Sequence, residues 1–201
     1  MAQFALDQIL PRFLLENPGV SVVQQASNRL EDLVKGGVDV AIRGHMGILP
    51  DSSLIQVRLA NVEWHLFCTP KYRGGISRAD EPKVLTEHPA LVLGRPTGAH
   101  QWQLTGIDGQ TASVPCQIRL ASDDMTTLKR ASALDLGIVA LPAYVCRPEV
   151  EARTLVRILP SWTAGSPQIS LLMPSRQGIL PAVEAFIAFI KQELPAVLDS
   201  R

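Results

Sequence analysis

Hydrophobic residues recur at helical spacing near the start of the chain and then give way to a short apolar run. Over residues 4–16 the apolar positions fall on one helical face, which predicts an amphipathic helix. These positions are Leu6, Ile9, Leu10, Phe13 and Leu14. Pro18–Gly19 ends this helix, and Val20–Val23 follows as a predicted short strand.

A second helix and a buried strand come next. Ser27 or Asn28 can cap this helix, and Gly36–Gly37 closes it. The apolar run Val38–Ile42 then predicts a buried strand. A strand, a helix and a strand with short joints form a βαβ unit, whose right-handed crossover makes its two strands parallel.

The rest of the chain continues this alternation of short apolar runs and amphipathic stretches. Further strands are predicted over Val62–Cys68, Ala90–Leu93, Cys116–Leu120, Gly137–Leu141, Leu155–Leu159 and Ile169–Met173. Two more runs, Gln101–Thr105 and Thr111–Val114, flank Gly106–Gly109 and predict a hairpin or tight loop. Helices are predicted over Asp80–His88, from Asp123 or Asp124 to about Leu134, and over Leu180–Leu198.

Strands that alternate with helices indicate a mostly parallel sheet covered on both faces. The pattern of apolar and polar residues changes near Cys68–Pro70 and again near Ser166–Ile169, which indicates a second lobe inserted into the first. We therefore expect an α/β protein with lobe I over residues 1–67 and 169–201 and lobe II over residues 68–168. Two crossings between lobes make a hinge, and a ligand is expected in the cleft between the lobes, at the carboxyl ends of strands.

Composition narrows the class of protein. Hydrophobic residues make up 46% of the 201 positions and charged residues 19%, which is typical of a globular chain that buries a core. Lys and Arg together number 19, as do Asp and Glu, so the chain lacks the basic excess of a domain that binds DNA by itself. The longest apolar stretch, Gly137–Val145, is about half a membrane span and contains Pro142. No membrane partner is therefore expected.

Cysteine usage and the N-terminal residues indicate a cytoplasmic protein. Cys68, Cys116 and Cys146 are far apart and lack CxxC spacing, so neither a disulfide framework nor a metal site is expected. Met1–Phe4 has neither the basic start nor the apolar core of a signal peptide. The motifs GxSxG, HExxH, GxxxxGK[ST] and GxGxxG do not occur, and the adjacent pair Asp123–Asp124 diverges. We therefore expect no enzyme and no cofactor.

Several segments, taken in order, resemble the effector-binding domain of LysR-type transcriptional regulators. They are Ile9–Phe13, Asn17–Val20, Gly37–Arg43, Leu66–Tyr72, His88–Pro89, Ser122–Asp123, Leu136–Pro142, Leu155–Leu159 and Val183–Ile190. Each segment is short, but their order and spacing extend through almost the whole chain. Ala41–Gly44 together with Trp102–Gly106 is similar to one large subgroup of the family. The resemblance implies two Rossmann-like lobes joined by a two-crossing hinge, the type 2 periplasmic-binding-protein-like fold.

The resemblance also has implications for segments outside this chain. The family's first strand precedes the helix at which this chain begins, so that strand is expected to be missing. In this family an N-terminal winged helix-turn-helix domain contacts DNA. That domain is expected to be absent from this chain, and DNA is expected to be bound only through it. The family further implies a homodimer or tetramer. In the implied dimer, the first helix of one protomer packs against the second lobe of its partner.

Three residues of lobe I are candidates for effector binding because they follow predicted strands. Ser27 stands at the start of a helix, where its hydroxyl and the free N–H groups can bind an anion; a plain helix cap is the alternative. Arg43 can bind a carboxylate in a bidentate pair, or else pair with a structural aspartate or cover the hinge. His45 can titrate near neutral pH if it is buried, and a solvent-facing loop position is the alternative.

Lobe II supplies further candidates at the ends of predicted strands and the start of a predicted helix. They are Gly94, Arg95, Thr97, Asp123, Met125, Leu141 and Pro142. The aspartates at 123 and 124 are expected to cap the helix, with Met125 facing the cleft and Leu141 and Pro142 forming an apolar floor. Trp102 and His65 are expected to be structural, and the alternative for Trp102 is a stacking wall for the ligand together with His100. The cysteines are expected to be buried hydrophobes, with a redox switch at Cys68 as the alternative.

Together these observations predict a ligand-sensing regulatory domain. A small organic effector, an anion given Arg43 and Arg95, would bind in the inter-lobe cleft and modulate transcription through the DNA-binding domain. The alternative is a solute-binding protein of an uptake system, which has the same architecture but is usually monomeric and needs a signal peptide or lipid anchor.

Overall fold

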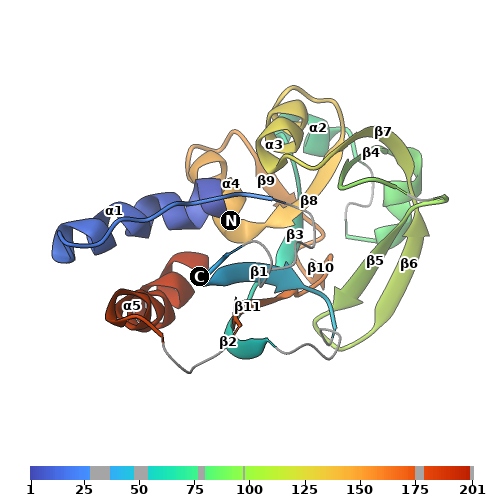
Figure 1. Ribbon diagram of the computed structural model, residues 1–201. Helices are drawn as coiled ribbons and strands as arrows, with labels where there is room; N and C mark the ends of the chain where they lie inside the picture. Colours follow the sequence, from blue (N-terminus) through green and yellow to red (C-terminus); the bar gives the residue numbers. More distant parts are fainter. Residues whose placement is uncertain (28–36, 48–53, 77–79, 97, 175–178, 200–201) are drawn as a thin grey trace. The chain divides into compact units, whose positions relative to one another are not determined.

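The computed structural model describes residues 1–27, 37–47, 54–76, 80–96, 98–174 and 179–199. The chain divides into two compact units (Figure 1). Unit 1 comprises Met1–Val62 and Pro167–Arg201, and unit 2 comprises Glu63–Ser166. The chain therefore crosses between the units twice, and the first crossing lies before the strand that ends at Cys68 rather than at its end.

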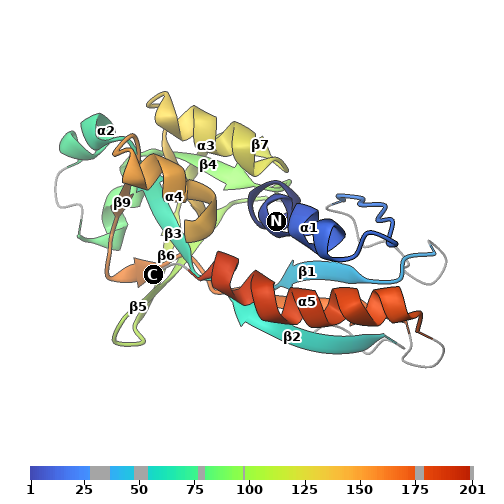
Figure 2. The same ribbon diagram turned by 90° about the vertical axis from the view of Figure 1, so that its left-hand side faces the viewer.

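Unit 1 is built on a sheet of three antiparallel strands. The order is β1 (Ala41–His45), β11 (Gln168–Met173), β2 (Ile55–Asn61). The helix α5 (Pro181–Leu198) packs on β2 and on α1 (Asp7–Glu16), which continues the π-helical turn η1 (Ala2–Leu6). Figure 2 shows α5 running along this sheet, with α1 beside it.

The helices of unit 1 meet through aromatic rings. The ring of Phe13 lies 5.2 Å from that of Phe186 and 5.3 Å from that of Phe189, centroid to centroid. Phe13 is 1% exposed, and Arg12 forms an ion pair with Glu193 at 2.9 Å beside it. The predicted first and last helices are thus confirmed, and their apolar faces bury each other.

The predicted βαβ unit is not present among the described residues. Residues 20–27 form no strand, and Val23 is 88% exposed. The strand predicted from Val38 begins instead at Ala41 and pairs antiparallel with β11. Local pattern cannot reveal this pairing, because β11 comes from the far end of the chain. The helix predicted after Ser27 lies outside the described residues.

Unit 2 contains a five-stranded mixed sheet. Its order is β7 (Gln117–Ser122), β4 (Pro89–Leu93), β8 (Ile138–Pro142), β3 (Trp64–Cys68), β9 (Val156–Ile158). The strands β7, β4 and β8 are parallel, whereas β3 runs antiparallel to both of its neighbours. Four of the five strands therefore run in one direction, and only β3 runs the other way. The expectation of a mostly parallel sheet holds for the direction of these four strands and is wrong for the antiparallel sheet of unit 1.

Helices and a hairpin complete unit 2. The helices are α2 (Pro70–Gly74), the 3-10 helix η2 (Pro82–Glu87), α3 (Met125–Ala133) and α4 (Ala143–Glu151). The hairpin strands β5 (Gln101–Gly106) and β6 (Thr111–Pro115) form a three-stranded antiparallel sheet with β10 (Trp162–Thr163). Trp102 and Leu104 point into the core, which confirms the structural interpretation of Trp102.

One glycine of unit 2 is required by its surroundings. Gly137 has φ +151° and lies between α3 and β8, directly against the backbone of Pro89 at the start of β4. A Cβ atom at Gly137 would collide with Pro89 O and would lie 3.0 Å from Pro89 C. Only glycine allows this close approach of two backbone segments.

Candidate functional site

The carboxyl ends of three strands of unit 2 lie at one edge of its sheet. Since β7, β4 and β8 are parallel, they end there at Ser122, Leu93 and Pro142. The antiparallel strand β3 begins at the same edge, where Trp64 pairs with Pro142. We call this the carboxyl edge; ligands of open α/β sheets collect at such edges.

Gly94 turns the chain out of the sheet at the carboxyl edge. Its φ of +85° lies in the left-handed region, and its N–H donates to Ser122 O at 2.8 Å. This bond ties the end of β4 to the end of β7. The exposed Arg95 therefore starts from a fixed backbone position beside the start of α3.

Asp124 caps the helix α3 at the same edge. Its carboxylate accepts hydrogen bonds from the N–H groups of Thr126 and Thr127, each at 3.0 Å, and from the Thr127 hydroxyl at 2.7 Å. The Thr127 hydroxyl is the main cause that lowers the pKa of Asp124. The cap predicted for the aspartates is confirmed at Asp124. The exposed Asp123 and the half-buried Met125 stand on either side of it.

The predicted apolar floor is buried within unit 2. Leu141 is fully buried and pairs with His65 across β8 and β3, while Pro142 ends the strand and precedes α4. Gly94, Arg95, Asp123, Met125 and Pro142 thus gather at the carboxyl edge, whereas Leu141 lies one residue back in the core. Thr97 lies outside the described residues.

The candidates in unit 1 stand on β1 rather than after it. Arg43 lies opposite Ser170, and His45 lies opposite Gln168 at the end of the strand. The prediction that Arg43 and His45 follow a strand is therefore wrong, because β1 starts three residues later than the apolar run and continues to His45. Ser27 lies in an exposed segment without regular secondary structure.

His45 belongs to a polar cluster that the sequence interpretation missed. Ser170 Oγ accepts hydrogen bonds from the side-chain amides of Gln56 and Gln168, each at 2.9 Å, and lies 3.0 Å from His45 Nε2. With two bonds accepted, the Ser170 hydroxyl donates its hydrogen to His45 Nε2. His45 Nδ1 then carries the ring proton and donates to Gly47 O at 2.8 Å. A serine inside the apolar strand 169–173 is the only local signal of this cluster.

The polar cluster shares one face of the sheet in unit 1 with Arg43. Residues 43 and 45 of β1 alternate with Ile42 and Gly44, and their partners on β11 are Ser170 and Gln168. This face carries a guanidinium group, two side-chain amides and an imidazole, and the amides and the imidazole are hydrogen-bonded within the cluster.

A shallow pocket of about 390 Å³ opens at the opposite, amino edge of the sheet in unit 2. Lys71, Tyr72, Gly75, His88 and Asp135 line it. Lys71 pairs with Asp135 at 3.0 Å, and the Tyr72 hydroxyl lies 3.3 Å from His88 Nδ1. The polar groups of this pocket are thus already paired with one another.

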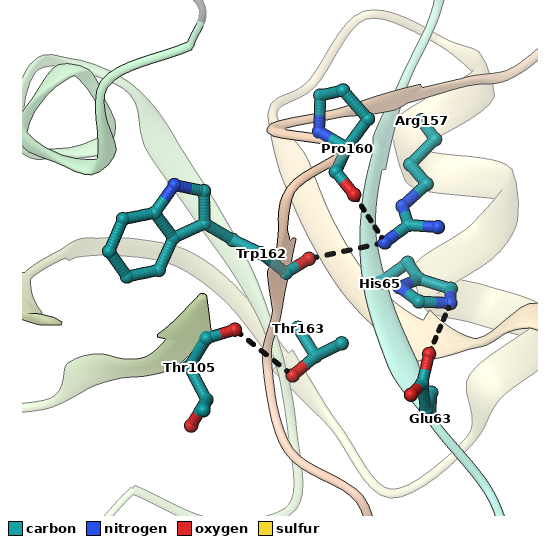
Figure 3. A network of polar contacts seen from close by, with 7 residues as sticks. All are labelled: Glu63, His65, Thr105, Arg157, Pro160, Trp162 and Thr163. Carbon is teal, nitrogen blue, oxygen red and sulfur yellow. Dashed lines mark hydrogen bonds and ion pairs between the residues drawn. The ribbon is translucent and has the colours of Figure 1, made fainter. Parts of the chain in front are cut away.

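His65 takes part in a network near the start of β3 (Figure 3). Its Nε2 lies 3.6 Å from Glu63 Oε2, and the ring is 4% exposed. Burial, with a smaller effect from the charge of Arg157, lowers the pKa of His65 to about 4. The imidazole is therefore neutral at neutral pH, in agreement with a structural role.

The cysteines are poor nucleophiles in the folded chain. Burial raises the pKa of Cys68 and of Cys146 to about 12, and it also raises that of the half-buried Cys116. A redox switch at Cys68 needs an exposed thiolate. The burial of Cys68 disfavours both its exposure and its ionisation.

The described part of the chain contains neither a cluster of metal-ligating side chains nor a membrane-spanning helix. No three His, Cys, Asp or Glu side chains in it are grouped so as to hold a metal ion. None of its helices has the length and apolar character needed to cross a membrane.

Comparisons with known proteins agree with this arrangement. A family model described as the LysR substrate binding domain matches residues 1–195. An HTH-type transcriptional regulator of Xanthomonas campestris is 25% identical over 92% of this chain and 54% of its own length. An HTH-type transcriptional repressor of Pseudomonas aeruginosa is 24% identical over 96% of this chain and 60% of its own. The chain thus spans little more than half of these relatives.

Solved structures show the same fold. The regulatory domain of CrgA, a LysR-type regulator from Neisseria meningitidis, matches with a TM-score of 0.81 at 18% identity, over 96% of this chain and 94% of that one. Full-length AphB, a virulence activator of Vibrio cholerae, matches with a TM-score of 0.80 at 24% identity, over 94% of this chain and 63% of that one. These neighbours have the expected two-lobe α/β fold, and the match to regulators does not favour a solute-binding protein. The chain belongs to the LysR substrate-binding domain family.

Proposed function

We propose that this chain senses a small organic anion and binds it in a cleft between its two units. The observation that supports this best is the carboxyl edge of unit 2, where three parallel strands end together and Gly94, Arg95 and the start of α3 follow them. The two crossings of the chain supply a hinge about which the units can change their arrangement.

The proposed site draws on both units. Arg43 on β1 and Arg95 supply guanidinium groups, which bind carboxylates through paired hydrogen bonds. Asp123 can accept a hydrogen bond from a hydroxyl of the effector, and Met125 and Pro142 provide apolar contact, with Leu141 behind them. Gly94 provides backbone close to the ligand. Ser27, His45 and Thr97 remain in the proposed set of ligand-contacting residues.

The whole protein is proposed to regulate transcription. We infer a homodimer or tetramer that contacts DNA through a separate winged helix-turn-helix domain and works in the cytoplasm without catalysing a reaction. The effector acts by binding one arrangement of the units more tightly than the other. Equal affinity for both arrangements would leave their equilibrium unchanged.

A thermal-shift screen tests effector binding. The panel contains aliphatic and aromatic carboxylates, neutral sugars and aromatic alcohols. A ligand present at about 100 times its Kd adds about 2.7 kcal/mol to the free energy of unfolding, which raises Tm by roughly 5–11 °C for a chain of this length. A shift with carboxylates alone supports the proposal, and a shift with neutral ligands alone contradicts the anionic effector.

Two variants then locate the site. Arg43→Ala and Arg95→Ala should each weaken binding of the active carboxylate by about 10- to 100-fold in calorimetry, the effect of losing a charged hydrogen-bond donor. Lys191→Ala, an exposed position of α5, is the matched control and should leave affinity unchanged. Unchanged affinity in both arginine variants would place the site elsewhere. Light scattering checks the assembly: a stable monomer would contradict the proposed dimer.

A further inference from the structure

The two segments that connect the units lie side by side. Val62 N–H donates to Pro167 O at 3.0 Å on one side of the boundary. On the other side, Trp64 N–H donates to Gly165 O at 2.9 Å, and Ala164 N–H donates to Trp64 O at 2.8 Å. The segment 161–166, which leads out of unit 2, is therefore hydrogen-bonded to the segment that leads in.

The same outgoing segment is also bonded to the hairpin. Its β10 residues pair with β5, Trp162 opposite Gly106 and Thr163 opposite Thr105. Ile107 N–H, at the hairpin turn, donates to Ser161 O at 3.0 Å, and the Thr163 hydroxyl donates to Thr105 O at 3.3 Å (Figure 3). Residues 161–163 of this segment are thus hydrogen-bonded to the hairpin, and residues 164–165 are hydrogen-bonded to Trp64 at the first crossing.

A strained turn leads into this segment. Leu159 has φ +49° and is fully buried, and its carbonyl accepts a hydrogen bond from Trp162 N–H at 2.9 Å. A bulky residue in the left-handed region is unfavourable, and it persists only where the surroundings hold the backbone in place.

Arg157 on β9 provides that support. Its Nη2 donates to Pro160 O at 2.8 Å and reaches Trp162 O at 3.4 Å, so that one guanidinium group spans the turn (Figure 3). The planar guanidinium has several donors in fixed directions, whereas a lysine ammonium is a compact group on a flexible stem. Phe67 of β3 pairs with Arg157 in the sheet, which fixes the arginine backbone.

We propose that Arg157 is a positioning residue that makes the β5–β6 hairpin and the outgoing segment 161–166 move as one element. A change of arrangement at the crossings is then transmitted to the hairpin turn at Ile107, which is 79% exposed. This transmission rests on the proposed function, since it matters only if an effector changes the arrangement of the units. The coupling itself is a property of the chain without ligand.

Hydrogen exchange followed by mass spectrometry tests the coupling in the ligand-free protein. In Arg157→Met, peptides covering 101–115 and 159–166 should both exchange roughly tenfold faster or more, because the turn loses its side-chain support and the hairpin is hydrogen-bonded to the segment that follows the turn. Peptides of β7 and β8 should not change. The matched control is Arg119→Met, since Arg119 also donates to one carbonyl of unit 2, Leu136 O at 3.2 Å, but away from the hairpin. This control should leave both test peptides unchanged.

The outcomes separate the proposal from its alternatives. Faster exchange in 159–166 with an unchanged hairpin would overturn the coupling, and so would unchanged exchange in both peptides. Faster exchange everywhere would indicate loss of the fold; Arg157→Lys then provides the test, and it should produce a smaller, still joint effect on the two peptides. A negative ligand screen would count against the proposed effector site without altering any of these results.

Discussion

Lys129 Nζ lies 2.7 Å from Glu149 Oε1 and joins α3 to α4 inside unit 2. The same ammonium donates to Val145 O at 3.0 Å, and the Lys129 side chain is only 11% exposed. Both helices begin at the carboxyl edge, α3 after β7 and α4 after β8. This pair therefore fixes the separation of the two helices that flank the proposed site.

Removing one partner of this pair should be costly. Lys129→Ala leaves the Glu149 carboxylate uncompensated, and we expect the free energy of unfolding to fall by about 3–5 kcal/mol in urea titrations. The double variant Lys129→Met with Glu149→Met is the control, because an apolar pair of similar volume is often neutral in such places. Equal losses in the single and double variants would show that the pairing of charges contributes nothing.

Gly137 should tolerate no side chain. In Gly137→Ala the new Cβ meets the backbone of Pro89, which cannot move without displacing β4. We expect a loss of about 1–3 kcal/mol in the free energy of unfolding. Gly19→Ala is the matched control, since a Cβ there meets nothing within 4 Å, and it should stay within about 0.5 kcal/mol of the parent. A neutral Gly137→Ala would contradict the close approach of the two segments.

His65 should make stability depend on pH below neutrality. Its pKa is about 4 in the folded chain, against about 6.5 in an unfolded chain. Between these values the unfolded chain binds a proton that the folded chain does not, so stability falls as the pH drops from about 6.5 to about 4. The slope from one such group reaches at most about 1.4 kcal/mol per pH unit. The free energy of unfolding, measured by urea titration, should depend more steeply on pH in the parent than in His65→Gln across this range. The same pH dependence in both proteins would contradict the lowered pKa of His65.

The thiols should differ in their rates of modification. Cys68 and Cys146 are fully buried, while Cys116 is partly exposed with its Sγ 3.6 Å from His100 O. In native protein at pH 8 we expect a disulfide reagent to modify Cys116 first and the other two only as the chain opens. Cys116→Ser should remove the fast phase. A fast phase that survives this substitution would show that a buried thiol is reactive.

Elements with a strong local pattern could be predicted from the sequence. The helices α1 and α5 follow from their apolar faces, α3 from its aspartate cap, and the β5–β6 hairpin from two runs around a glycine-containing turn. The helix α4 could not be predicted from the local pattern, because Pro148 lies inside it and an interior proline indicates a break in a helix.

The local sequence pattern could not predict which strands pair with one another. The strand β11 inserts between β1 and β2, although more than a hundred residues separate it from either, so the direction of the sheet in unit 1 could not be inferred. The same pairing brings Ser170 and Gln168 to His45. At the proposed site, by contrast, Gly94, Arg95 and Asp123 follow strands whose positions the apolar runs did indicate.

The order of strands in unit 1 has a consequence for how the chain folds during synthesis. The strands β1 and β2 do not pair with each other, and each pairs with β11. The residues of β11 are synthesised only after all of unit 2. Unit 2 is contiguous and has its own core, so it can fold first while the earlier residues of unit 1 are still without their central strand. A chain that stops at residue 166 should therefore retain the cooperative unfolding of unit 2 and lose the sheet of unit 1 entirely.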